Sequence, residues 1–146
     1  MSIDCQQAMD TRDDYTVFSA FASHVIDFYR NDPRSIRLGL FSALEDGPVT
    51  NAFHSTRGKT PIEILAGYIQ QRINEGAFRQ VSASLASRLF IEAMAMFMVD
   101  QEASLTTVPL CFSCEEAVDT MVRIFTDGLK ADKASIAEFM HIDYRT

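Results

Sequence analysis

The chain has 146 residues, the usual size of one domain with a real hydrophobic core, and carries a formal net charge of −7. This acidity argues against a nucleic-acid-binding surface, because duplex affinity comes largely from lysines and arginines that neutralise phosphates. The sequence has no basic leader and no apolar run of about 20 residues, so we expect a cytoplasmic protein that does not span a membrane. Three cysteines, an odd number, fit a reducing compartment.

Every local signal along the chain is helical, and the sequence predicts an all-α fold of about six helices. We expect residues 1–13 to form a polar, loose leader and residues 14–146 to form one domain. Asp14 is expected to cap the first helix. Its apolar positions recur at spacings of three and four, on one broad aromatic face: Phe18, Phe21, Ala22, Val25, Phe28 and Tyr29. Pro33 is expected to end this helix and begin the next.

The middle of the chain holds a short predicted helix and then a strong start signal. Residues 34–44 carry helical spacing, and Gly47–Pro48 breaks the pattern. Thr60 to Glu63 combines a threonine cap, a proline at the first helical position and a glutamate that closes a capping box. Gly76 is expected to end that helix in the left-handed conformation.

The next predicted helix, from about Ser82 to Glu102, contains seven consecutive apolar residues, AMAMFMV, at positions 93–99. A helix on the surface of a monomer presents one polar side to water. This helix must therefore be covered by its own domain and by something else, most simply a second copy of the chain.

Two further capping boxes follow, at Ser113–Glu116 and at Ser135–Glu138. The first opens a long helix whose apolar residues spread over a wider arc than one core-facing stripe needs. The second predicts a short terminal helix through Tyr144.

The order of these parts, together with four local strings, resembles the C-terminal regulatory domain of TetR-family transcription regulators, from about Tyr15 to Lys130. The strings are FYRNDP at 28–33, YIQQRINEGAFR at 68–79, LASRLF at 85–90 and the segment 118–129 with Phe125 and Gly128. The resemblance implies a homodimer in which the last two long helices of each subunit form a four-helix bundle. It also implies a pocket between the earlier helices for a small apolar or amphipathic effector.

The chain departs from that family at its start, where only a short acidic leader precedes the first predicted regulatory helix. Members of the family begin with a basic helix-turn-helix unit, so we do not expect this chain alone to bind an operator. The leading hypothesis is the effector-binding and dimerisation part of a TetR-like repressor. The alternative is a stand-alone module that binds hydrophobic ligands or forms mixed dimers, without a direct DNA role.

The predicted dimer surface combines one side of each of the two long helices. In the helix from Ser82, a stripe containing Leu89 and Phe90 is expected to face the core. The residues expected nearer the partner are Arg88, Ile91, Ala95, Met98 and Val99, together with Val118, Val122, Phe125 and Leu129 of the last long helix. The alternative is a thick monomeric core that these side chains simply fill.

A ligand pocket is a weaker inference from an interior rich in aromatic and thioether side chains. The residues expected around it are Phe18, Phe21, Val25, Phe41, Leu44, Leu65, Tyr68, Phe90, Met94 and Phe97. By spacing alone a packed core is the favoured interpretation, and the family resemblance brings the ligand pocket level with it. Tyr68, His24 and His54 are polar groups that can orient a ligand.

Two other kinds of site are weakly indicated. Cys111 and Cys114 form a C-x-x-C motif at a helix start, but acidic residues follow at once and no second Cys or His pair offers metal-ligand spacing. Catalytic motifs such as a glycine-rich phosphate loop or a nucleophile elbow are missing from the sequence. We therefore expect no enzyme activity, no metal and no cofactor.

Overall fold

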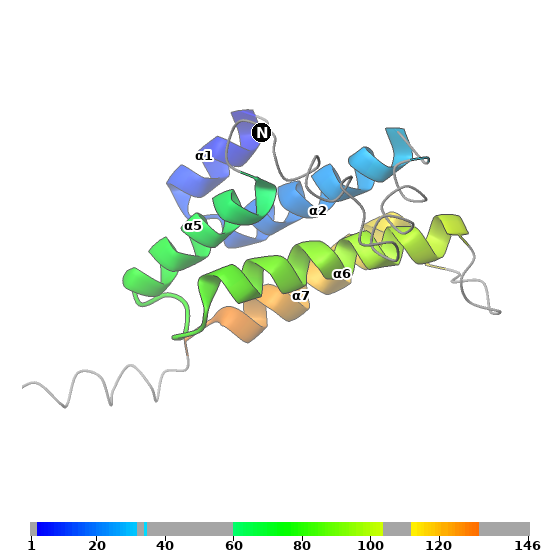
Figure 1. Cartoon of the computed structure of the whole chain (residues 1–146). Coiled ribbons are helices and arrows are strands. Elements are labelled where there is room, and N and C mark those ends of the chain that lie inside the picture. Colours follow the sequence, from blue (N-terminus) through cyan, green and yellow to red (C-terminus); the bar gives the residue numbers. More distant parts are fainter. Residues whose placement is uncertain (1–2, 32–33, 35–59, 104–111, 132–146) are drawn as a thin grey trace, which may run out of the picture.

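The computed structural model describes residues 3–31, 34, 60–103 and 112–131, and each regular element in these ranges is an α-helix (Figure 1). This agrees with the predicted all-α class. The predicted helix at 34–44, apart from Arg34, and the predicted helix at 135–144 lie outside the described residues. The helices are α1 (Ile3–Thr11), α2 (Asp14–Asn31), α5 (Pro61–Asn74), α6 (Ala83–Ala103) and α7 (Cys114–Leu129).

Helix α2 lies at the centre of the arrangement. It packs against α1 on one side and against α6 and α7 on the other, while α5 packs along α6. Figure 1 shows α6 and α7 running along one side of the molecule, with α1 and α5 towards the opposite side. None of the described helices is long and apolar enough to cross a membrane.

Helix α1 occupies the segment expected to be a loose leader, so that expectation is wrong. The buried residues of α1 follow helical spacing and form one side of the helix: Cys5, Ala8 and Met9. Small or soft apolar side chains of this kind give a weak signal in the sequence, and burial against α2 decides the conformation.

The corner between α1 and α2 depends on two adjacent residues. Arg12 ends α1 with φ at 62°, in the left-handed region that a non-glycine residue seldom adopts. Asp13, rather than the predicted Asp14, caps α2, because its carboxylate accepts hydrogen bonds from the backbone N–H and the hydroxyl of Thr16 (3.1 and 2.6 Å). These bonds hold the pKa of Asp13 below its usual value.

Helix α5 begins and ends where the sequence predicts. Thr60 and Glu63 form the predicted capping box, and Gly76 adopts a left-handed φ of 74° just past the helix end. The chain then turns into α6, which is fastened to the start of α5 because the buried Ser87 hydroxyl donates to the Ile62 carbonyl (2.7 Å).

Helix α7 begins at the predicted Ser113–Glu116 capping box. Its end is joined to the link between α5 and α6 by an isolated antiparallel bridge between Phe78 and Lys130. In this bridge the Arg79 N–H donates to the Leu129 carbonyl (2.8 Å). Residues distant in sequence thereby hold together the end of α5, the start of α6 and the end of α7.

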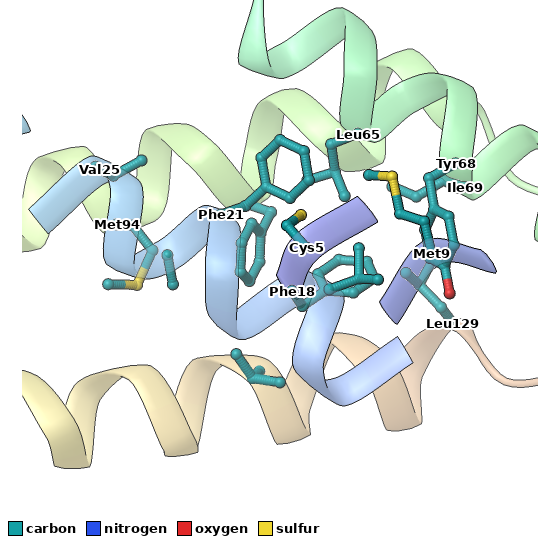
Figure 2. Close-up of a cluster of buried hydrophobic side chains, with 14 of the residues drawn as sticks. Cys5, Met9, Phe18, Phe21, Val25, Leu65, Tyr68, Ile69, Met94 and Leu129 are labelled. Carbon is teal, nitrogen blue, oxygen red and sulfur yellow. The ribbon is translucent and has the colours of Figure 1, made fainter. Parts of the chain in front are cut away.

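The hydrophobic core draws side chains from all five described helices (Figure 2). Phe90 of α6 stands at its centre with no exposed surface. Its ring meets Phe18 of α2 and Phe125 of α7 edge to face, with both pairs of ring centroids 5.0 Å apart. This aromatic contact joins the three longest described helices.

Candidate functional site

Most of the residues predicted to surround a ligand lie together in the core. Seven of them are buried in one cluster, and Figure 2 labels six of these: Phe18, Phe21, Val25, Leu65, Tyr68 and Met94. Phe90 is the seventh, and Phe97 is partly buried beside them. Phe41 and Leu44 lie outside the described residues. The eight described side chains pack against the core, as the alternative interpretation expects.

A partly open hollow of about 280 Å³ lies between α1, α2 and the start of α5. We call it the α1–α2–α5 hollow. Its described lining residues are Cys5, Ala20, Phe21, Ser23, His24, Asp27, Pro61 and Ile64. Cys5 and Phe21 therefore belong both to the core and to the lining of the hollow.

The hollow has an apolar wall and a polar rim. Cys5 and Phe21, both labelled in Figure 2, are buried in the wall, and burial raises the pKa of the Cys5 thiol. Ser23, His24 and Asp27 come from α2, and their side chains are exposed at the rim. Of the predicted polar groups, His24 is the one that lines the α1–α2–α5 hollow; Tyr68 lines a second, neighbouring hollow, and His54 lies outside the described residues.

Tyr68, the third predicted polar group, has another partner. Its hydroxyl donates to the Asp14 carboxylate at 2.6 Å, and burial together with that carboxylate raises the pKa of Tyr68. This bond belongs to an ion network between the α1–α2 corner and the end of α5. A group engaged in this way has little left to offer a ligand.

Arg72 is the centre of that network. Its guanidinium binds both oxygens of Asp14 (2.8 and 3.0 Å) and one oxygen of Glu75 (2.7 Å). Arg12 completes the network through a 2.8 Å contact with Glu75. The hydrogen bonds from Arg72 and Arg12 hold the pKa of Glu75 below its usual value. Two helices and a turn are fastened here by charge-assisted bonds.

Most of the residues predicted to meet a second copy are covered, wholly or in part, within the chain itself. Met98, Val99, Val122 and Leu129 are buried within the chain. Four others are partly buried against the core or the cluster around it: Ile91, Ala95, Val118 and Phe125. Arg88 is exposed but pairs with Glu92 on its own helix (2.6 Å). Eight of the nine predicted interface residues are thus wholly or partly covered within the chain, and Arg88 is exposed.

The opposite sides of the same two helices carry several large exposed apolar side chains, interrupted by Glu92 between Leu89 and Met96 on α6. Leu85, Leu89 and Met96 of α6 are 56, 52 and 57% exposed, and Phe112 and Ile124 are 62 and 63% exposed. A groove of about 260 Å³ crosses this surface, with an almost wholly apolar lining. We define the α6–α7 face as Leu85, Leu89, Ala93, Met96, Phe97, Phe112, Ala117, Met121 and Ile124.

Gly128 extends the α7 side of this face. It follows Ala117, Met121 and Ile124 at helical spacing, and a methyl group built on it would meet no atom within 4 Å. Glycine inside a helix costs roughly 0.5–1 kcal/mol relative to alanine. The described fold thus offers no steric reason for glycine at this position.

The cysteine motif is only half described, because Cys111 lies outside the described residues. Cys114 is partly exposed at the start of α7, and an Arg30 Nη2 atom donates to its sulfur at 3.2 Å. Among residues 3–31, 34, 60–103 and 112–131, no three His, Cys, Asp or Glu side chains are grouped so that they could hold a metal ion.

Comparison with protein-family models, with curated proteins and with solved structures gave no match for this chain. The candidate sites are therefore the two surfaces that the geometry itself distinguishes, the α1–α2–α5 hollow and the α6–α7 face.

Proposed function

We propose that this chain is a dimerising regulatory domain that binds a small amphipathic effector, comparable to the C-terminal domain of a TetR-like repressor. The observation that carries the proposal is the α6–α7 face. Large apolar side chains that stay more than half exposed, arranged around an apolar groove, are typical of a surface that another molecule covers. The occupant we propose is a second copy of the same chain.

The dimensions of the face suit a dimer. Helix α6 has 21 residues, so it is about 30 Å long, and helices pack about 10 Å apart. Two such helices present a face of roughly 600 Å², close to the roughly 800 Å² per partner of a stable protein interface. A twofold axis through this face would pair α6 and α7 with their copies as a four-helix arrangement.

The charged side chains near the face also favour a partner of the same kind. Arg88 pairs with Glu92 and Arg123 pairs with Asp119 along their own helices, at 2.6 and 2.9 Å. The Arg88–Glu92 pair lies among the exposed apolar residues of α6, because Glu92 is three positions after Leu89 and four before Met96. Arg123 and Asp119 instead contact Tyr15 of α2, so only the first pair would be covered by a partner on the face. A second copy can therefore cover the face without burying an unpaired charge.

The effector site in this proposal is the α1–α2–α5 hollow. It combines an apolar wall with a few polar groups, which is the usual composition of a small-molecule site. An effector acts as a switch only if it binds one arrangement of the helices more tightly than another. Because α1 and α2 both line the hollow, a ligand there can favour one packing of α1 on α2.

Light scattering at micromolar concentration tests the dimer. The chain should show twice its own mass of 16.4 kDa, and Ile124→Glu should shift the mass towards one chain, because it places a charge in the middle of the face. Phe28→Glu is the matched control, since Phe28 is also exposed but lies on α2. A single-chain mass for the unmodified protein would overturn the proposal.

A further inference from the structure

The lining of the α1–α2–α5 hollow also indicates the chemical class of its ligand. The polar end of the hollow is formed by Ser23, His24 and Asp27, all on α2. Asp27 is the single charged group among the eight described lining residues, and neither Lys nor Arg is among them. The described lining therefore carries a negative charge, in a chain whose formal net charge is −7.

The three rim residues can act together because of their spacing. Ser23, His24 and Asp27 are separated by one, three and four positions, so they lie on one side of α2 within about one turn. The Asp27 carboxylate can accept hydrogen bonds at both oxygens, and a serine hydroxyl and an imidazole nitrogen can each offer a further acceptor. No hydrogen bond or ion pair between Asp27 and another described residue is present to occupy that carboxylate.

The other end of the hollow is apolar. Phe21, Ile64 and Pro61 form it together with Ala20 and the buried Cys5. The volume of about 280 Å³ lies at the lower end of the roughly 300–1,000 Å³ found for small-molecule sites. A ligand that fits both ends is therefore compact, with one apolar end and one end that donates hydrogen bonds.

We propose that the hollow binds a compact organic cation, with a primary ammonium group against Asp27 and an apolar body against Phe21 and Ile64. This inference rests on the proposed effector-binding function. The ammonium supplies three donors to the acceptors of the rim and compensates the charge of Asp27. An anion of the same size would meet the carboxylate unfavourably, and a neutral isostere would leave its charge without a partner.

The experiment compares three probes of nearly equal size, phenethylammonium, 2-phenylethanol and phenylacetate. Their binding is followed by the shifts of the Ala20 and Ile64 methyl signals in NMR titrations of the full chain. Phenethylammonium should bind about five-fold more tightly than 2-phenylethanol, as expected for one partly exposed ion pair. Asp27→Asn should remove that preference. Asp127→Asn, the same change on α7 outside the hollow, should preserve it.

The outcomes separate the ligand class from the site. Equal binding of the cation and the alcohol, tighter binding of phenylacetate, or a preference that survives Asp27→Asn would overturn the cation proposal and leave the hollow as a ligand site. If none of the probes shifts the two methyl signals at millimolar concentration, the hollow is not a ligand site and the effector part of the proposed function also fails. The dimer is tested separately by its mass.

Discussion

The ion network that joins the α1–α2 corner to the end of α5, which we call the corner, differs from the α6–α7 face. Surface groups of the corner find their partners within the chain, whereas those of the face do not. At the corner, Arg72 and Arg12 share the carboxylates of Asp14 and Glu75, and Tyr68 donates to the same network. On the face, apolar side chains such as Leu89 and Ile124 stay more than half exposed. The first surface is completed by the chain itself, whereas the second is suited to another molecule. The predictions below use matched residues from the two regions.

The largest effect is expected from two neighbours on α6. Phe90→Ala should lower the free energy of unfolding by about 3–5 kcal/mol, because Phe90 has no exposed surface and packs against two other rings. Leu89→Ala should cost the folded chain far less and should mainly weaken the dimer. Urea unfolding at fixed protein concentration, combined with light scattering, measures both effects. Equal losses of unfolding free energy in the two variants would contradict the assignment of Leu89 to a free face.

The second prediction compares two arginines. Arg72→Met should lower the free energy of unfolding by about 2–3 kcal/mol, since it leaves the partly buried Asp14 carboxylate without its main partner. Arg88→Met should change it by less than about 0.5 kcal/mol, because that ion pair is largely exposed. Chemical denaturation measures the free energy of unfolding of both variants. A similar small loss for both would mean that the corner network contributes no more than a surface salt bridge.

The third prediction concerns alkaline stability. Burial and the Asp14 carboxylate raise the pKa of Tyr68 above the usual tyrosine value of 10.0. Since the folded-state pKa is the higher one, the protonated phenol contributes stability that is complete below pH 10 and is lost as the pH rises through the folded-state value. Tyr68→Phe should lower the free energy of unfolding by about 1 kcal/mol at pH 7. Above pH 10, the free energy of unfolding of this variant should fall less steeply than that of the unmodified chain.

The control for this prediction is Tyr15→Phe, whose hydroxyl also donates to a carboxylate, that of Asp119, but at an exposed position (2.7 Å). This variant should show a smaller loss at neutral pH. Thermal unfolding measured from pH 7 to pH 11 compares the three proteins. If the stability of Tyr68→Phe fell as steeply above pH 10 as that of the unmodified chain, the role assigned to Tyr68 would be contradicted.

The smallest effect is expected at two helical glycines. Gly67→Ala and Gly128→Ala should each raise the stability of the folded chain by about 0.5–1 kcal/mol, because a methyl group at either position meets no atom within 4 Å. Gly128→Ala should also weaken the dimer if a partner helix approaches it closely, whereas Gly67→Ala on α5 should not. Sedimentation equilibrium distinguishes them. An unchanged dissociation constant in Gly128→Ala would place the partner away from the end of α7.

The sequence predicted the ends of elements better than their orientation. The capping boxes at Thr60–Glu63 and Ser113–Glu116 and the left-handed Gly76 are confirmed, because each depends on side chains and dihedral angles within a few residues. Helix α1 was missed because its buried residues, among them Cys5 and Ala8, are small and become apolar contacts only against α2.

The rotation of α6 could not be predicted for a related reason. A helix that is apolar on nearly all sides has little periodicity, so its sequence does not indicate which side meets the core. The packing of α5 and α2 against α6 decides this, and Met98 is buried while Leu89 stays half exposed. The hollow was likewise missed, except for Phe21 and His24, because three separate helices bring its lining residues together.

The most direct test of the account is an isotope-filtered NOE measurement on a mixture of labelled and unlabelled chains, which detects only contacts between copies. The account predicts contacts between copies at the methyl groups of Leu89, Met96 and Ile124, and none at those of Ala20 or Ile64. Contacts confined to residues of the α1–α2–α5 hollow, or no contact between copies at the concentration of the NMR sample, would contradict the central claim that a second copy covers the α6–α7 face.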